Sequence, residues 1–182
     1  MHAVAHRLAG LGLTALLMAA GLGAQAQAPE HGTDHTARPA ATPSTSFTIG
    51  GAVQTPRTVT LADLQKQPAT TDAVYFSTGR GPVKASFTGV LLWTLLSEAG
   101  IKTDPSVKND SLRRTVVVTA ADGYGVALSL GELDPEFGAA QALIAYAQDG
   151  KPLGDSGFAR LILPADKDGG RNVMRISAIE VR

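Results

Sequence analysis

The sequence of 182 residues contains no cysteine. The protein therefore cannot form a disulfide, carry a lipid on an N-terminal cysteine, use a thiol nucleophile or bind zinc through thiolates. An excess of charge of one sign is also lacking, because 16 basic residues are balanced by 16 acidic residues. Without an overall positive field the chain is a poor candidate for binding nucleic acid. We therefore expect a domain held together by core packing, which a hydrophobic content of 44% can support.

Histidine is missing from the part of the chain that is expected to fold. All four histidines precede residue 47: His2, His6, His31 and His35. The folded part thus lacks the usual general base at neutral pH and the commonest metal ligand. His31 and His35 are four residues apart, a spacing that suits metal binding only on a helix. The neighbouring Pro29 and Gly32 disfavour a helix there.

The N-terminal residues have the pattern of an export signal. An uncharged apolar run follows Arg7, and Ala24-Gln25-Ala26 fits the small-x-small rule for cleavage. The run is shorter than the roughly 20 residues that span a bilayer. We therefore predict a signal peptide over residues 1–26, a flexible tail over residues 27–46 and one domain over residues 47–182. The mature protein is expected to be soluble, not membrane-spanning, and periplasmic or secreted.

Strands outnumber helices in the domain. Apolar runs between turn residues predict short strands within residues 47–49, 57–60, 72–76, 112–120, 124–129, 143–148, 159–163 and 173–181. Two capping boxes, Thr60 with Asp63 and Ser129 with Glu132, predict the starts of short helices. The longest helix is predicted over Thr88–Ala99, because apolar residues form a broad face there. The fold class is therefore α+β, with a mixed, mostly antiparallel sheet and a few short helices.

The order of these elements, together with several short motifs, resembles a known family. The motifs are Phe87-Thr88-Gly89-Val90, Asp122-Gly123-Tyr124, Asp149-Gly150-Lys151-Pro152-Leu153, and the stretch from Ala159 to Arg171 that continues to Ile179-Glu180-Val181. In this order and spacing the chain resembles a small stand-alone, exported member of the molybdopterin-dependent oxidoreductase family. The resemblance covers nearly all of residues 47–182. It implies the fold of the sulfite-oxidase molybdopterin domain and molybdopterin as the family's cofactor.

The sequence departs from that family at the metal ligand. The resemblance implies a cysteine thiolate bound to molybdenum just after the strand at 72–76, where this chain has Phe76-Ser77-Thr78-Gly79-Arg80-Gly81. Neither phenylalanine nor a neutral serine hydroxyl replaces a soft thiolate. The single Arg7 also differs from the twin-arginine signal of exported members that carry the cofactor. We expect no cofactor or metal in the isolated protein, although the resemblance leaves molybdopterin possible, since the family holds the pterin mainly through hydrogen bonds and arginines.

Seven residues are candidates for binding the cofactor or another anion: Ser77, Thr78, Arg80, Tyr124, Arg160, Lys167 and Arg171. Each also has a structural interpretation, as part of a polar hairpin loop, as a solvated charge or as packing over a sheet edge. Arg160 lies within an apolar strand, where an unpaired charge is costly. We favour a salt bridge there, with one of three acids as its partner: Asp155, Asp166 or Glu180. No catalytic residue can be named, because acid–base chemistry would fall to Asp or Glu and no acidic pair stands out.

Three functions remain open at this point. The favoured one is an exported, metal-free binding or accessory module for a small anionic or pterin-like ligand. The second is a molybdopterin-dependent oxidoreductase of the sulfite-oxidase type with non-cysteine metal coordination, for which a periplasmic or membrane redox partner is expected. The third is a protein-interaction domain without a ligand. Convergence of Arg80, Arg160 and Arg171 on one cavity would favour binding.

Overall fold

The computed structural model describes residues 44–182. The predicted signal peptide, most of the predicted tail and all four histidines lie outside the described residues. Within residues 44–182, no helix combines the length and the apolar character needed to cross a membrane.

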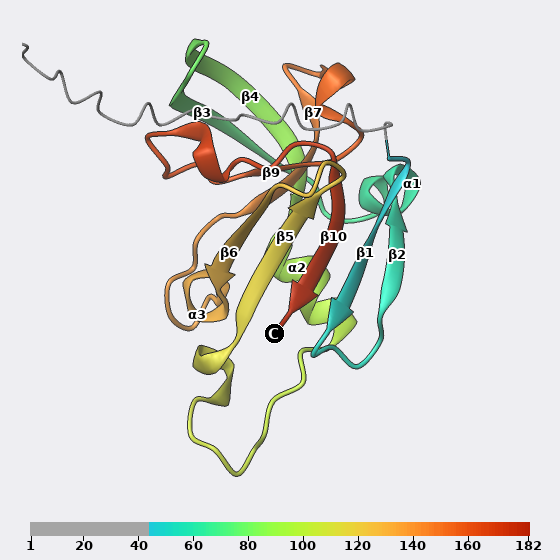
Figure 1. The fold of residues 1–182 in the computed structure, drawn as a ribbon, viewed down its shortest axis with the longest axis vertical. Coiled ribbons are helices and arrows are strands. Elements are labelled where there is room, and N and C mark those ends of the chain that lie inside the picture. Colours follow the sequence, from blue (N-terminus) through green and yellow to red (C-terminus); the bar gives the residue numbers. More distant parts are fainter. Residues whose placement is uncertain (1–43) are drawn as a thin grey trace, which may run out of the picture. The chain divides into compact units, whose positions relative to one another are not determined.

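The first of two five-stranded sheets has the strand order β2-β1-β10-β5-β6 (Figure 1). Neighbouring strands are antiparallel except β1 and β10, which are parallel. The sheet thus places the first and the last described strands side by side. The strands are β1 (Ser46–Gly51), β2 (Arg57–Thr60), β5 (Thr115–Ala120), β6 (Gly125–Ser129) and β10 (Ile176–Val181).

The second sheet is entirely antiparallel and is built on a long hairpin. Strands β3 (Thr70–Thr78) and β4 (Gly81–Leu91) form this hairpin, and β4 also pairs with β7 (Leu143–Gln148). Two short strands, β8 (Lys151–Pro152) and β9 (Arg160–Ile162), pair with successive parts of β7. The hairpin rises at the top of the view in Figure 1.

The helices are few and short. The α-helices are α1 (Leu61–Gln65), α2 (Leu92–Ala99) and α3 (Leu130–Leu133), and the 3-10 helices are η1 (Asp110–Arg113), η2 (Gly154–Ser156) and η3 (Gly169–Arg171). Both predicted capping boxes form, from Thr60 with Asp63 at α1 and from Ser129 with Glu132 at α3. With mostly antiparallel strands, these elements confirm the predicted α+β class.

The predicted helix over Thr88–Ala99 is wrong in its first turn. Helix α2 begins only at Leu92, and residues 88–91 belong to β4, where they pair with β7. Gly89 lies so close to β7 that a Cβ atom there would be 2.2 Å from the carbonyl oxygen of Ile144. This backbone contact between distant segments overrides the local helical pattern, which is a tertiary effect that the apolar spacing does not report.

The domain has two buried clusters with β7 and β9 between them. Side chains alternate across a strand, so Ile144 of β7 and Leu161 of β9 face the main core, while Ile162 of β9 faces the second core. Arg160, two residues before Ile162, shares that second face. The second core consists of Val74, Phe76, Ala85, Phe87, Leu143, Ala145, Leu153 and Ile162.

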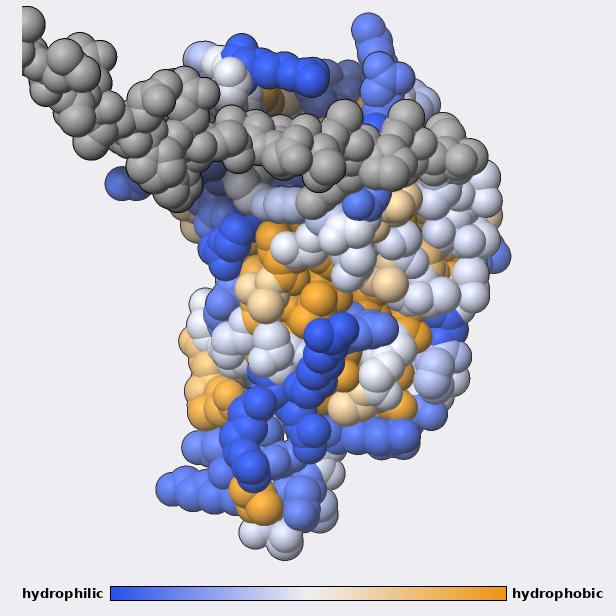
Figure 2. Space-filling view, in the orientation of Figure 1, coloured by the Kyte–Doolittle hydropathy of each residue, from blue (hydrophilic) through white to orange (hydrophobic). Residues whose placement is uncertain are grey.

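Apolar surface gathers at the centre of the face that the first sheet turns toward the viewer (Figure 2). The side chains on the opposite face of this sheet, such as Val118 and Ile179, are fully buried in the main core. The sheet is therefore packed on one face only, as is common for antiparallel sheets.

Candidate functional site

A cleft of about 490 Å³ opens between the β3–β4 hairpin and the segment that follows β9. We call it the Arg160 cleft. It contains three of the seven residues predicted from the sequence, namely Thr78, Arg80 and Arg160. Its lining residues are Thr78, Gly79, Arg80, Arg160, Asp168, Gly169, Gly170, Asn172 and Met174.

The hairpin wall of the cleft is a tight turn fixed by Thr78. The Thr78 hydroxyl donates to the carbonyl of Gly81 at 2.7 Å and accepts from the amide of Arg80 at 3.1 Å. The predicted polar loop is thus shorter than expected, because β3 continues through Thr78 and β4 starts at Gly81. This turn places Arg80 at the edge of the cleft with its side chain exposed.

The opposite wall is held against β3 by backbone contacts. The amide of Ser77 donates to the carbonyl of Lys167 at 2.9 Å, and Ser77 forms a parallel bridge with Asp168. A Cβ atom on Gly169 would lie 2.8 Å from Cδ2 of Phe76. Only glycine therefore allows the wall to approach the buried Phe76 ring so closely. Figure 1 shows the red segment after β9 running beside β3.

Arg160 reaches into the cleft from β9 across two aromatic rings. Its guanidinium carbon lies 5.7 Å from the ring centroid of Phe76 and 5.4 Å from that of Phe87. Both rings are fully buried in the second core. A cation over aromatic faces is attracted by the ring quadrupole, so the two rings fix the direction in which the guanidinium points.

The predicted salt bridge of Arg160 is wrong. Among residues 44–182 no carboxylate pairs with it: Asp166 binds Arg171 and Glu180 binds Arg182. The Nε atom of Arg160 is buried and has no hydrogen-bond partner. The alternation along β9 turns Arg160 toward the aromatic side of the strand. The one acid of the cleft, Asp168, is not within salt-bridge distance of it and accepts from the amide of Gly170 instead.

Burial lowers the pKa of the Arg160 guanidinium below its ordinary value. Because a guanidinium is so strong a base, the group nevertheless stays charged at neutral pH. The cleft therefore contains a half-buried positive charge that no described acid neutralises.

Asn172 adds a second donor without a partner. Its side chain is buried, with 5% of the residue exposed. Its Oδ1 atom accepts from the amide of Leu163 at 2.9 Å, which fixes the amide plane, whereas its Nδ2 atom has no hydrogen-bond partner. No pattern in the sequence marks this residue, because an unsatisfied amide depends on packing between distant segments.

A second pocket of about 270 Å³ adjoins the Arg160 cleft, and we call it the Arg175 pocket. The hydroxyl of Tyr124, a predicted site residue, donates to the carbonyl of Gly170 in its wall. Arg175 also lines this pocket and was not predicted, since nothing in its local sequence separates it from a surface arginine. The lining residues are Ala120, Asp122, Tyr124, Gly169, Gly170, Asn172, Met174 and Arg175.

The other three predicted residues do not line either cavity. Ser77 and Lys167 are exposed and lie along the contact between β3 and the opposite wall. Arg171 turns toward a separate pocket, where it binds Asp166 at 2.7 Å and Glu132 at 3.2 Å. The hydrogen bonds from Arg171 to Asp166, reinforced by Glu132, raise the pKa of Arg171. Arg80 and Arg160 thus share one cavity, and Arg171 does not.

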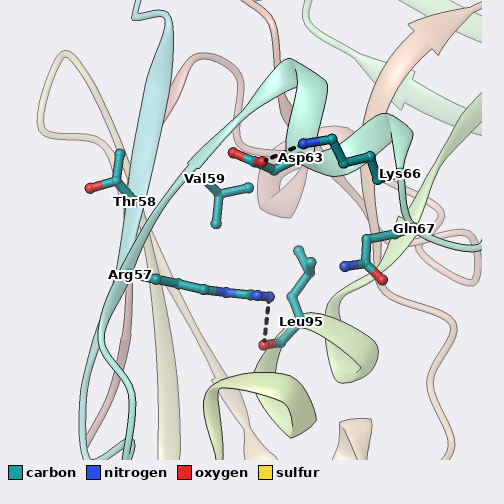
Figure 3. A pocket seen from close by; sticks show the side chains of 7 residues that line it. All are labelled: Arg57, Thr58, Val59, Asp63, Lys66, Gln67 and Leu95. Atoms are coloured by element: carbon teal, nitrogen blue, oxygen red, sulfur yellow. Dashed lines mark hydrogen bonds and ion pairs between the residues drawn. The ribbon is translucent and has the colours of Figure 1, made fainter.

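A further pocket, between β2, α1 and α2, has the charged rim shown in Figure 3. Here the charges pair with each other, Arg57 with Glu98 at 2.6 Å and Lys66 with Asp63 at 3.6 Å. Arg57 also donates to the carbonyl of Leu95. Because its cations already have carboxylate partners, this pocket is a weaker anion site than the Arg160 cleft.

The chemistry available at the Arg160 cleft is binding of an anion. It offers the guanidinium groups of Arg80 and Arg160 and the free side-chain amide of Asn172, beside one carboxylate, Asp168, and it has no histidine or cysteine. In the described part of the chain no three His, Cys, Asp or Glu side chains are grouped so that they could hold a metal ion. The cleft thus presents two positive charges and an unused amide donor, with Asp168 as its one acid.

Comparison with known proteins agrees with this fold. The crystal structure of the sulfane dehydrogenase SoxCD from Paracoccus pantotrophus is similar, with a TM-score of 0.62 and 21% sequence identity. The similarity covers 75% of this chain and 37% of that chain, so this chain corresponds to only part of that protein. No curated protein matches the sequence. The family model described as "Oxidoreductase molybdopterin binding domain" matches residues 31–182. Since this match spans most of the sequence, and the fold agrees with it, the chain belongs to the oxidoreductase molybdopterin-binding domain family.

Proposed function

We propose that the Arg160 cleft binds a small anionic or pterin-like ligand, and that the domain is a metal-free binding or accessory module. The observation that carries this proposal is the half-buried guanidinium of Arg160, which has no carboxylate partner among residues 44–182 and whose Nε atom has no hydrogen-bond partner.

Keeping the Arg160 guanidinium half-buried without a described partner costs free energy. A buried charged donor without a partner costs about 1–3 kcal/mol or more, and the two rings return only about 0.5–2 kcal/mol. A salt bridge would remove this cost, but the described chain supplies none to Arg160. An anionic ligand would supply the missing partner from outside.

The organic part of molybdopterin fits the residues present. A pterin ring and a phosphate need hydrogen-bond donors and a flat apolar surface, and the cleft offers Arg160, Asn172 and Thr78 beside Gly169 and Gly170. Its volume of about 490 Å³ lies within the range of small-molecule sites. Arg160 and Asn172 would donate to the pterin and its phosphate, whereas the Thr78 hydroxyl, which already donates to Gly81, would only accept.

A thiolate-bound molybdenum does not fit the same residues. The sequence has no cysteine, and the strand after which the family resemblance places that ligand carries the buried ring of Phe76. The thioether of Met174 is the one soft ligand among the lining residues of the cleft. Oxygen-atom transfer, the chemistry that the metal-loaded cofactor would supply, is therefore not part of the proposal.

A thermal-shift screen with pterin, phosphate, sulfite and nucleotides tests binding. A ligand at one hundred times its Kd adds about 2.7 kcal/mol to stability and so raises Tm. Arg160→Gln should abolish the rise, whereas Arg182→Gln, which removes an equal charge at an exposed ion pair, should not. If no compound raises the Tm of the wild type, the domain is the ligand-free interaction module instead.

Family membership favours one other function, a molybdopterin-dependent oxidoreductase with non-cysteine coordination. Elemental analysis of protein purified from its own host separates the two. We expect far less than one molybdenum per chain, and stoichiometric metal that survives gel filtration would overturn the metal-free proposal.

Export and a redox partner are part of the proposal as well. The N-terminal pattern supports cleavage after Ala26 and a periplasmic or secreted location. The fold that the chain shares with a sulfane dehydrogenase supports a periplasmic or membrane redox partner. Mass spectrometry of the exported protein should show an N-terminus at Gln27, and an intact N-terminus in the cytoplasm would contradict this.

A further inference from the structure

We infer that the ligand extends from the Arg160 cleft across Gly169 and Gly170 into the Arg175 pocket, where Arg175 binds a second anionic group. The inference rests on the proposed function of the Arg160 cleft. It narrows the ligand to an elongated molecule with phosphate or carboxylate groups at two separate positions.

The two cavities adjoin each other at one wall. They share four lining residues, Gly169, Gly170, Asn172 and Met174. Two of these are glycines, so no side chain separates the cavities at that point. A Cβ atom on Gly170 would meet only the Asp168 Oδ1 atom, at 3.3 Å, and would otherwise project into open space.

Unpartnered donors line both sides of this shared wall. The Nε atom of Arg175 is buried and has no hydrogen-bond partner, as at Arg160. Among residues 44–182 no carboxylate lies within salt-bridge distance of Arg175. The Nδ2 atom of Asn172, in a side chain that is almost wholly buried, lacks a partner where the two cavities meet. Three buried donors without partners among residues 44–182 thus lie along the two adjoining cavities, whose lining also includes one carboxylate each, Asp168 and Asp122.

The backbone brings Arg160 and Arg175 onto neighbouring segments. The amide of Leu161 donates to the carbonyl of Val173 at 2.8 Å, and the amide of Ile176 donates to that of Ala159 at 3.3 Å. The residues on either side of Arg160 therefore bond to residues on either side of Arg175. The two arginines therefore lie on adjacent segments, so one elongated ligand can reach both.

Arg175 is held in a strained conformation. Its φ angle is 51°, in the left-handed region that favours glycine. The conformation is fixed from both sides, because the Arg175 amide donates to Ser156 at 2.8 Å and its carbonyl accepts from Ala121 at 2.9 Å. Gly157 leaves room for it, since a Cβ atom there would lie 3.0 Å from Cα and Cγ of Arg175. Strained residues of this kind are concentrated at binding sites.

Isothermal titration calorimetry with inorganic phosphate and with tripolyphosphate tests the second contact. In the wild type, tripolyphosphate should bind more tightly than phosphate. Arg175→Gln should lower the affinity for tripolyphosphate about tenfold or more, which is the effect of losing one charge-assisted contact. The same variant should leave the affinity for phosphate unchanged. Gly170→Ala should also lower the affinity for tripolyphosphate, because its methyl group would lie between the two cavities. Arg175→Lys should recover part of the affinity for tripolyphosphate that Arg175→Gln loses.

Control variants separate this inference from the proposed function. Arg182→Gln removes the same charge at a site outside both cavities and should leave both affinities unchanged. Arg160→Gln should abolish phosphate binding. If phosphate binding depends on Arg160 but tripolyphosphate binds Arg175→Gln as tightly as wild type, the second contact is wrong and the proposed function stands. If the wild type binds neither probe, the second contact fails, and the proposed function then depends on the thermal-shift screen with pterin, sulfite and nucleotides. Circular dichroism of each variant verifies folding.

Discussion

The guanidinium of Arg160 lies over the buried ring of Phe76, 5.7 Å from its centroid. Phe76 belongs to β3, the strand after which the family resemblance places a metal-binding cysteine. A cation and an aromatic ring thus occupy the region where a metal-loaded relative would need a soft anion. The positive charges of Arg80 and Arg160 in the cleft therefore favour binding of a negatively charged molecule over coordination of a cation.

Replacing Arg160 by methionine should stabilise the domain. The substitution removes a half-buried charge without a described partner but keeps a long side chain that packs well on aromatic rings. We expect the free energy of unfolding to rise by about 0.5–2 kcal/mol, because the desolvation cost exceeds the cation–π attraction. Urea denaturation measures this. A loss of more than about 1 kcal/mol would mean that Arg160 has an internal partner.

Gly169→Ala and Gly170→Ala should differ in stability although the residues are adjacent. A methyl group on Gly169 would lie 2.8 Å from the Phe76 ring, which is buried and cannot move aside. Overpacking of this kind costs about 1–3 kcal/mol. At Gly170 the only contact is Asp168 Oδ1 at 3.3 Å, so we expect a change within about 0.5 kcal/mol. Equal effects in thermal unfolding would contradict the close packing of this wall.

Arg175→Gly should raise stability while it removes binding of the second anionic group. Glycine adopts a φ of 51° without the penalty of about 1–2 kcal/mol that other residues incur in the left-handed region. The gain should be below this value, because the flexible glycine costs more entropy on folding. Chemical denaturation shows whether the free energy of unfolding rises or falls. A strongly destabilised variant would assign Arg175 a packing role instead.

Asp110 should make stability depend on pH in the acid range. A hydrogen bond from the Asp104 amide at 2.9 Å and one from Arg114 at 2.8 Å hold the pKa of Asp110 below its usual value. A carboxyl with a lowered folded pKa stabilises the protein above its unfolded pKa, near 4, and this contribution is lost as the pH falls through the folded pKa.

The matched variant for this effect is Asp110→Asn. It should be less stable than the wild type at pH 7, and the difference should shrink as the pH is lowered from about 5 to about 2.5. Urea midpoints across that range provide the measurement. A difference that stays constant with pH would show that the carboxylate charge is not what matters.

The sequence predicted best what depends on neighbouring residues. The capping boxes at Thr60 and Ser129 formed as expected, because each needs only residues three positions apart. The long helix was misplaced at its start, because the contact of Gly89 with Ile144 joins segments that are distant in the sequence. Local patterns therefore identified most elements but not every boundary.

The candidate site was only partly accessible to sequence reasoning. Three of the seven candidate residues, Thr78, Arg80 and Arg160, line one cavity, whereas the expected convergence of Arg171 with Arg80 and Arg160 did not occur. Asn172 and Arg175 were missed, because their significance lies in hydrogen bonds that are not made. Arg171 looked like an equivalent cation, but Asp166 is close enough to bind it and turn it away.

The parallel pairing of β1 with β10 has a consequence for how the domain is made. Strand β10 lies between β1 and β5, so the first sheet has a gap in its middle until the final strand is present. A nascent chain that ends before Ile176 can form only the two outer pairs, β1 with β2 and β5 with β6. Such distant pairing makes folding slow. The domain should thus complete its fold only after synthesis of nearly all its residues, and a ribosome-bound chain lacking β10 should remain sensitive to protease.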